Sequence, residues 1–158
     1  MGTVAERWKI EAVLALVRQV EACDFFVAGE YNPSSKTRAF MRLVEFDYRD
    51  VRRIMRGLEV EDYCEGPLSD DKGRPHDLWV FGAYVAQFET YIKFAIYVIQ
   101  GTVKSICVSF HEAERPLSYP YRKASYMTCT KIAALPGMLG RKLTRHTRYG
   151  TMSSKSEA

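Results

Sequence analysis

The spacing of apolar residues along the chain changes near residue 77, and this change predicts helices before that point and strands after it. Three earlier stretches, 5–22, 37–44 and 48–57, repeat apolar residues every three or four positions, as amphipathic helices do. Asp47 is a candidate N-cap for the third helix, and Gly57 is a candidate stop. The stripe of the first helix consists of Ile10, Val13, Leu14, Val17 and Val20.

After residue 77, apolar and polar residues alternate, which is the pattern of half-buried strands. We expect strands over 78–85, 88–98 and 103–111, and a short extended segment at 24–29. The stretch 62–76 is rich in Pro, Gly and charged residues and is predicted to be a loop. The fold class that follows is α+β, with N-terminal helices packed on a small antiparallel sheet.

The last two strands form a predicted hairpin, and the length of its loop decides which side chains meet. A three-residue loop at 100–102 places the apolar residues of one strand opposite those of the other. A two-residue loop would instead place apolar residues opposite polar ones along the whole hairpin. We therefore expect the three-residue loop, with Ile106, Val108 and Phe110 on the buried face of the last strand.

The other face of this hairpin carries the candidate chemistry. The same register sets Tyr91 opposite His111 and Lys93 opposite Ser109. Cleaving RNA without a metal requires a group that takes a proton from the 2′-hydroxyl, a group that gives one to the leaving oxygen, and positive charge on the phosphate. His111 can move protons near neutral pH, Lys93 can hold the phosphate, and Tyr91 can donate a hydrogen bond or stack on a base.

Simpler interpretations stand beside this one. A tyrosine on a strand is most often structural, and a lysine on a strand often only keeps a sheet face soluble. His111 next to Glu112 is compatible with an ordinary surface ion pair. These three residue types on alternating strands are common, so composition and register alone favour the structural interpretation, and catalysis is the sharper hypothesis beside it.

The distribution of charge suggests a different hypothesis. The net charge is +4, but residues 115–158 carry nine Lys and Arg against one acidic residue, so the rest of the chain is net negative. We expect one domain over 1–122 and a basic, partly disordered tail over 123–158, with a short helix near 129–135. The tail and the helix 48–57 favour a non-catalytic module that binds RNA, ribosome or an acidic protein. A solvated face is the preferred interpretation of the arginines of that helix, which are Arg49, Arg52, Arg53 and Arg56.

Several classes of protein are disfavoured. No apolar run approaches the roughly 18 residues that span a bilayer, so we expect a cytoplasmic protein without a membrane partner. Glu112 and Glu114 beside His111 supply too few ligands for a divalent ion, and we expect no metal and no organic cofactor. The cysteines have no zinc-site spacing and are expected to be reduced and mostly buried; they are Cys23, Cys64, Cys107 and Cys129.

The order and spacing of several short segments resemble the MqsR toxin family. The segments are GLEVEDYCEGP (57–67), WVFG (79–82), YIK (91–93), CVSFHEAE (107–114), PL (116–117) and YPYR (119–122). The similarity covers roughly residues 8–122 and is greatest to the branch whose members have Ser-Phe-His and Tyr-Pro-Tyr segments. No single segment is specific, but their order together is fairly specific.

This resemblance implies a RelE-like fold and an mRNA endoribonuclease that halts growth until a cognate antitoxin, expected to be a helix-turn-helix protein, neutralises it. An inactive remnant of such a toxin is a further possibility. The family's strand tyrosine matches Tyr91. The chain has Glu65 and His111 where the better-known branch has lysines, and Val80 where it has a glutamine, which shifts proton transfer towards His111. The expected substrate-binding residues are Tyr63, Lys72, Arg74, His76 and Arg122.

Overall fold

The computed structural model describes residues 4–123. Its helices are α1 (Arg7–Gln19), α2 (Lys36–Leu43) and α3 (Tyr48–Arg56), with short 3-10 helices η1 (Ala22–Asp24) and η2 (Val60–Asp62). Its strands are β1 (Phe25–Val27), β2 (Tyr63–Leu68), β3 (Leu78–Val85), β4 (Phe88–Ile99) and β5 (Thr102–Glu112). The helix expected near 129–135 and the rest of the basic tail lie outside the described residues.

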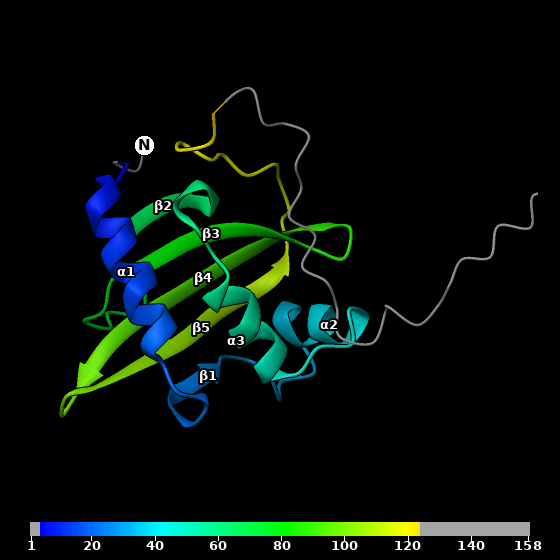
Figure 1. Ribbon diagram of the computed structural model, residues 1–158. Helices are drawn as coiled ribbons and strands as arrows, with labels where there is room; N and C mark the ends of the chain where they lie inside the picture. The colour runs from blue at the N-terminus through cyan, green and yellow to red at the C-terminus, as the bar shows by residue number, and fades with distance from the viewer. Residues whose placement is uncertain (1–3, 124–158) are drawn as a thin grey trace, which may run out of the picture.

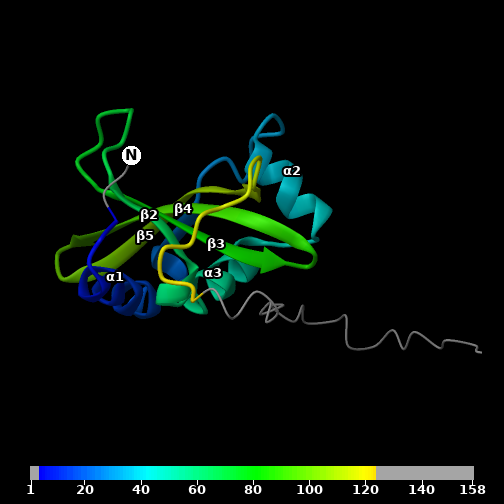
Figure 2. The same cartoon turned by 90° about the horizontal axis from the view of Figure 1, so that it is seen from above.

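The strands form one five-stranded sheet in the order β1-β5-β4-β3-β2. Helices α1 and α3 cover one face of this sheet, and α2 packs against β5 beyond the end of the short edge strand β1 (Figures 1 and 2). The predicted α+β class, with N-terminal helices packed on a sheet, is confirmed. The sheet is mixed rather than antiparallel, because β1 pairs with β5 in parallel. Within residues 4–123, no helix is long and apolar enough to cross a membrane.

The three helices form where the apolar spacing predicts them, and the third begins and ends at the predicted signals, Asp47 and Gly57. The side chain of Asp47 accepts hydrogen bonds from the backbone N–H groups of Arg49 and Asp50, and the Asp50 carboxylate accepts one from the N–H of Asp47. This reciprocal capping box starts α3, and Gly57 is its C-cap. The buried stripe of α1 consists of Ile10, Leu14 and Val17, which join the main core.

Part of the predicted loop 62–76 is a strand. Strand β2 pairs with β3, but two register irregularities interrupt it, so apolar and polar residues do not alternate along it. The sequence pattern therefore carried no strand signal at this position. Tyr63 anchors β2, because its side chain is fully buried in the core and its hydroxyl donates a hydrogen bond to the carbonyl of Gly66.

The predicted length of the β4–β5 hairpin loop is wrong. The loop has two residues, Gln100 and Gly101, both at positive φ (50° and 78°), which is the backbone of a type I′ turn. The prediction missed a β-bulge, in which Val108 is the extra residue on β5 between Ser109 and Cys107.

The bulge reverses which side chains of β5 face the core. Ser105 and Cys107 are fully buried in place of the expected Ile106 and Val108, and the Ser105 hydroxyl donates to the carbonyl of Ala95. Beyond the bulge, the shorter loop and the extra residue Val108 offset each other, so the register there is the predicted one. The pairs Tyr91–His111 and Lys93–Ser109 therefore form as predicted, and Phe110 is buried as predicted.

The sheet face away from α1 and α3, which we call the open face, carries the alternate residues of each strand. Leu78, Val80 and Ala95 lie there; they are buried, yet they do not belong to the main core cluster. Residues 113–122, which we call the strap, follow β5 and cross this face toward β2 (Figure 2). Because the strap passes over Gly82, a Cβ at that position would meet Leu117 and Tyr119.

Hydrogen bonds at both ends fasten the strap. The Glu89 carboxylate accepts hydrogen bonds from the backbone N–H of Leu117 at 2.8 Å and from the Tyr119 hydroxyl at 3.3 Å. At the far end, the Tyr121 hydroxyl donates to the carbonyl of Ala5 at 2.7 Å. The Arg122 guanidinium donates to the carbonyl of Glu61 and to a carboxylate oxygen of Asp62, both at 3.2 Å. The strap is therefore part of the folded domain.

Candidate active site

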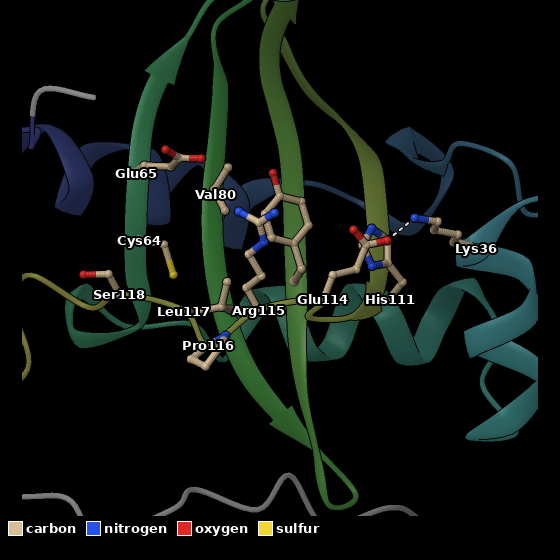
Figure 3. Close-up of a pocket in the computed structure, with 11 residues that line it drawn as sticks. Lys36, Cys64, Glu65, Val80, His111, Glu114, Arg115, Pro116, Leu117 and Ser118 are labelled. Atoms are coloured by element: carbon tan, nitrogen blue, oxygen red, sulfur yellow. Dashed lines mark hydrogen bonds and ion pairs between the residues drawn. The ribbon is translucent and has the colours of Figure 1, made fainter. Parts of the chain in front are cut away.

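A cavity of about 520 Å³ opens between the strap and the open face of the sheet (Figure 3). Its walls come from α2, from four strands and from the strap, so segments far apart in sequence meet there. The residues that line it are Lys36, Cys64, Glu65, Val80, Tyr91, His111, Glu114, Arg115, Pro116, Leu117 and Ser118.

Tyr91 and His111 form one wall of this cavity. Their rings are stacked across β4 and β5, with centroids 5.4 Å apart and planes inclined by 22°. His111 Nδ1 lies 2.9 Å from the carbonyl oxygen of Glu112. If Nδ1 is protonated and donates this hydrogen bond, Nε2 is the ring nitrogen that can exchange a proton with a substrate. Burial, with a smaller contribution from Glu65, raises the pKa of the Tyr91 hydroxyl, so it stays protonated and can donate a hydrogen bond at neutral pH.

Two cations that the sequence pattern did not single out also line the cavity. Lys36 begins α2, and the neighbouring Thr37 fixes that helix end against β5 by accepting a hydrogen bond from the N–H of Phe110 at 3.1 Å. The Lys36 ammonium makes an ion pair with Glu114. Arg115 reaches from the strap across the cavity (Figure 3). No local sequence signal could have found these residues, because only the fold brings them to His111.

The opposite wall carries a thiol and a carboxylate from β2. Burial raises the pKa of the Cys64 thiol to about 12, so it is not a thiolate at neutral pH and is a poor nucleophile. The Glu65 carboxylate is exposed and directed from β2 toward β3 (Figure 3). Within residues 4–123 it makes no hydrogen bond or ion pair, so it is available to a ligand. In the same range, no three His, Cys, Asp or Glu side chains are grouped so that they could hold a metal ion.

The remaining predicted catalytic residue, Lys93, lies outside the cavity lining. It shares the open face with Tyr91, two residues along β4, and is half-buried opposite Val80 and Ser109. That spacing places it about 7 Å from Tyr91 along the strand. The positive charge that lines the cavity comes from Lys36 and Arg115 instead.

The predicted substrate-binding residues have different positions. The prediction for Tyr63 is wrong, because its side chain is fully buried and its hydroxyl is used inside the domain. Arg122 fastens the strap and stacks over Tyr119, its guanidinium 3.5 Å from the ring centroid, and it does not line the cavity. A contact between Arg122 and RNA stays a prediction.

Lys72, Arg74 and His76 lie on the loop between β2 and β3, outside the cavity lining. Arg74 makes an ion pair with Asp70. His76 stacks on Tyr97, with ring centroids 4.9 Å apart. Contacts of these three residues with RNA stay a prediction. His76 lies too far from His111 to contact the same nucleotide, because Tyr97 is six residues, or about 20 Å, from Tyr91 along β4.

The arginines of α3 are largely engaged within the domain. Arg49 pairs with Asp47, and Arg53 pairs with Asp50. Arg52 donates two hydrogen bonds to the carbonyl of Val20 at 2.7 and 3.1 Å. Three of the four guanidinium groups therefore already have partners within the domain, and the alternative of a non-catalytic binding module stays a prediction.

Fold and site together define an α+β protein whose sheet carries, on the face away from its main helices, a cavity with a stacked Tyr–His pair and two cations. No protein-family model matches the chain, and no curated protein or solved structure matches it. The resemblance to MqsR toxins therefore depends on the short segments of the sequence alone.

Proposed function

We propose that the protein is a metal-independent endoribonuclease that cleaves mRNA in this cavity. The observation that carries the proposal is the stacked Tyr91–His111 pair in a cavity that also holds Lys36 and Arg115. A proton-transfer group, a hydrogen-bond donor and two cations are the groups that transesterification of RNA requires.

The reaction begins with attack of a ribose 2′-oxygen on the adjacent phosphorus. The P–O5′ bond breaks, which leaves a 2′,3′-cyclic phosphate on one fragment and a 5′-hydroxyl on the other. In the proposed mechanism, Glu65 takes the proton of the 2′-hydroxyl, and protonated His111 gives one to the leaving 5′-oxygen. Arg115 and Lys36 neutralise the charge that develops on the phosphorane, and Tyr91 donates a hydrogen bond to it.

The positions of Glu65 and His111 are compatible with a base and an acid that act on opposite sides of one phosphate. They lie on β2 and β5, three strand spacings or about 14 Å apart at the backbone, and both line the same cavity. Side chains that reach inward from both sides leave room for a phosphate between them. An in-line displacement needs its base and its acid on opposite sides of the phosphorus, as in this arrangement.

The test is the incubation of purified full-length protein with a long mRNA in the presence of EDTA. We expect fragments that end in 2′,3′-cyclic phosphate and begin with a 5′-hydroxyl. His111→Ala, purified in parallel to exclude a contaminating nuclease, should lower the rate by about 10²–10⁴-fold. Arg115→Ala should also lower it strongly, whereas Arg7→Ala on α1 is the matched control. An intact RNA across many sequences with wild-type protein would refute the proposal.

The biological role that we propose is that of a toxin acting in the cytoplasm. This part depends on the resemblance to MqsR toxins, which act on mRNA and are neutralised by an antitoxin. Expression of wild-type protein should arrest growth, and co-expression of a helix-turn-helix protein encoded beside it should restore growth. Expression of His111→Ala should not arrest growth. A folded wild-type product that leaves growth unaffected would indicate an inactive remnant.

A further inference from the structure

A second stacked aromatic pair lies on the open face, at the other end of β4. His76 and Tyr97 stack with ring centroids 4.9 Å apart and planes inclined by 22°, much as Tyr91 and His111 do. His76 comes just before β3, at the position that the regular β3–β4 register would place opposite Tyr97. It is exposed, and Tyr97 is half-buried, so the outer face of the imidazole is open to solvent.

The residues between the two pairs form a continuous row on the same face. Tyr91, Lys93, Ala95 and Tyr97 alternate along β4 with residues that face the core, and β3 pairs with this stretch without interruption. Lys93 makes no ion pair within the described part of the chain. The loop that carries His76 projects from the sheet on the side away from α1 and α3 (Figure 2).

We propose that this row binds single-stranded RNA that leads away from the cavity, with one base stacked on the His76–Tyr97 pair and a phosphate held by Lys93. Proteins bind unpaired nucleotides by stacking bases on aromatic rings beside cations that contact the backbone. The row offers both at a separation of about 20 Å, so only a strand of roughly four or more nucleotides could reach both aromatic pairs.

This inference rests on the proposed function, because the strand that crosses the row is the one that enters the cavity. It adds a binding site remote from the reacting phosphate and gives Lys93 a contact outside the cavity. A duplex fits poorly, because its bases are paired and stacked on one another and are not available to a ring on the sheet.

The experiment measures binding of full-length protein to 2′-O-methylated oligonucleotides, which lack the nucleophilic hydroxyl and cannot be cleaved by the proposed route. Affinity is measured by fluorescence anisotropy for strands of about three and about ten nucleotides. Tyr97→Leu should weaken binding of the longer strand by about ten-fold or more and leave the shorter strand unaffected. His76→Ala, in an exposed loop where a substitution does not threaten the fold, should act in the same direction.

One control and one further variant of the row complete the experiment. Trp8→Leu removes an exposed aromatic ring from α1, on the opposite side of the sheet, and should leave both affinities unchanged. Lys93→Gln should reduce the salt dependence of binding by about one phosphate contact.

The outcomes distinguish this inference from the proposed function. If wild-type protein cleaves RNA but His76→Ala and Tyr97→Leu bind the longer strand like wild type, the row is not a binding site. If wild-type protein never cleaves RNA, but both variants bind the longer strand more weakly than wild type does, the row is a binding site and the ribonuclease proposal fails.

Discussion

The contact between the strap and β3 makes a sharp prediction at Gly82. This residue faces Tyr91 across the β3–β4 pairing, and the strap passes directly over it. A Cβ built on Gly82 would lie 2.7 Å from Leu117 Cδ1 and 2.8 Å from Tyr119 Cε1, and closer still to the Tyr119 hydroxyl. Ordinary contacts of this kind are about 3.5–4 Å, so Gly82→Ala must push the strap away from the sheet by about an ångström.

The expected loss of stability for Gly82→Ala is about 1–3 kcal/mol, the usual cost of inserting a methyl group into a filled space. Movement of the strap would also weaken its hydrogen bonds to Glu89 and displace Arg115 from the cavity. We therefore expect a lower midpoint of urea unfolding together with slower RNA cleavage.

Gly57→Ala is the matched control. At Gly57, φ is −86° and the nearest atom to an added Cβ is the carbonyl oxygen of Ile54 at 3.5 Å, so alanine fits there. This variant should be as stable as wild type or slightly more stable. If Gly82→Ala unfolded at the same urea concentration as wild type and cleaved RNA at the same rate, the strap would not be pressed against β3 as described.

Asp47→Ala should cost about 1 kcal/mol in urea unfolding, because α3 loses its N-cap. Hydrogen bonds to Asp47 lower its pKa, so its contribution is present above about pH 4 and is lost as the pH falls further; the difference from wild type should shrink in acid. Thr37→Val should lower the free energy of unfolding by about 1–3 kcal/mol, because the buried N–H of Phe110 loses its acceptor. Amide exchange at Phe110 should become faster, and exchange that is unchanged or slower would contradict this. In neutral iodoacetamide, peptide mass spectrometry should find exposed Cys23 alkylated well before half-buried Cys64, because burial raises the pKa of the Cys64 thiol to about 12; equal rates would contradict that raised pKa.

The apolar pattern predicted the helices well, because each is an amphipathic segment whose period is visible locally. Strands β3 and β4 also form where they were expected, although only β4 alternates clearly, because β3 is buried on both faces over Leu78–Phe81. Strand β2 escaped prediction because its irregular pairing and its Gly66–Pro67 step read as a loop. The parallel pairing of β1 with β5 depends on residues about 80 positions apart, and no local pattern encodes it.

The Tyr91–His111 pair was predicted correctly through a register that was partly wrong. A two-residue loop and a bulge at Val108 together shift β5 by the same amount as the three-residue loop that the pattern favoured. The error was therefore confined to the stretch between loop and bulge, where Cys107 takes the buried position expected for Val108.

The amino-acid sequence alone determined where the helices and the long strands lie and which side chains share a face of β4, because these properties follow from local periodicity. Only the tertiary structure decided what surrounds His111. Lys36 lies at the start of α2, which is held to β5 by the hydrogen bond between Thr37 and Phe110. Arg115 lies on the strap, which is held by Glu89. Such contacts form between segments distant in sequence, whose meeting depends on how the whole chain packs.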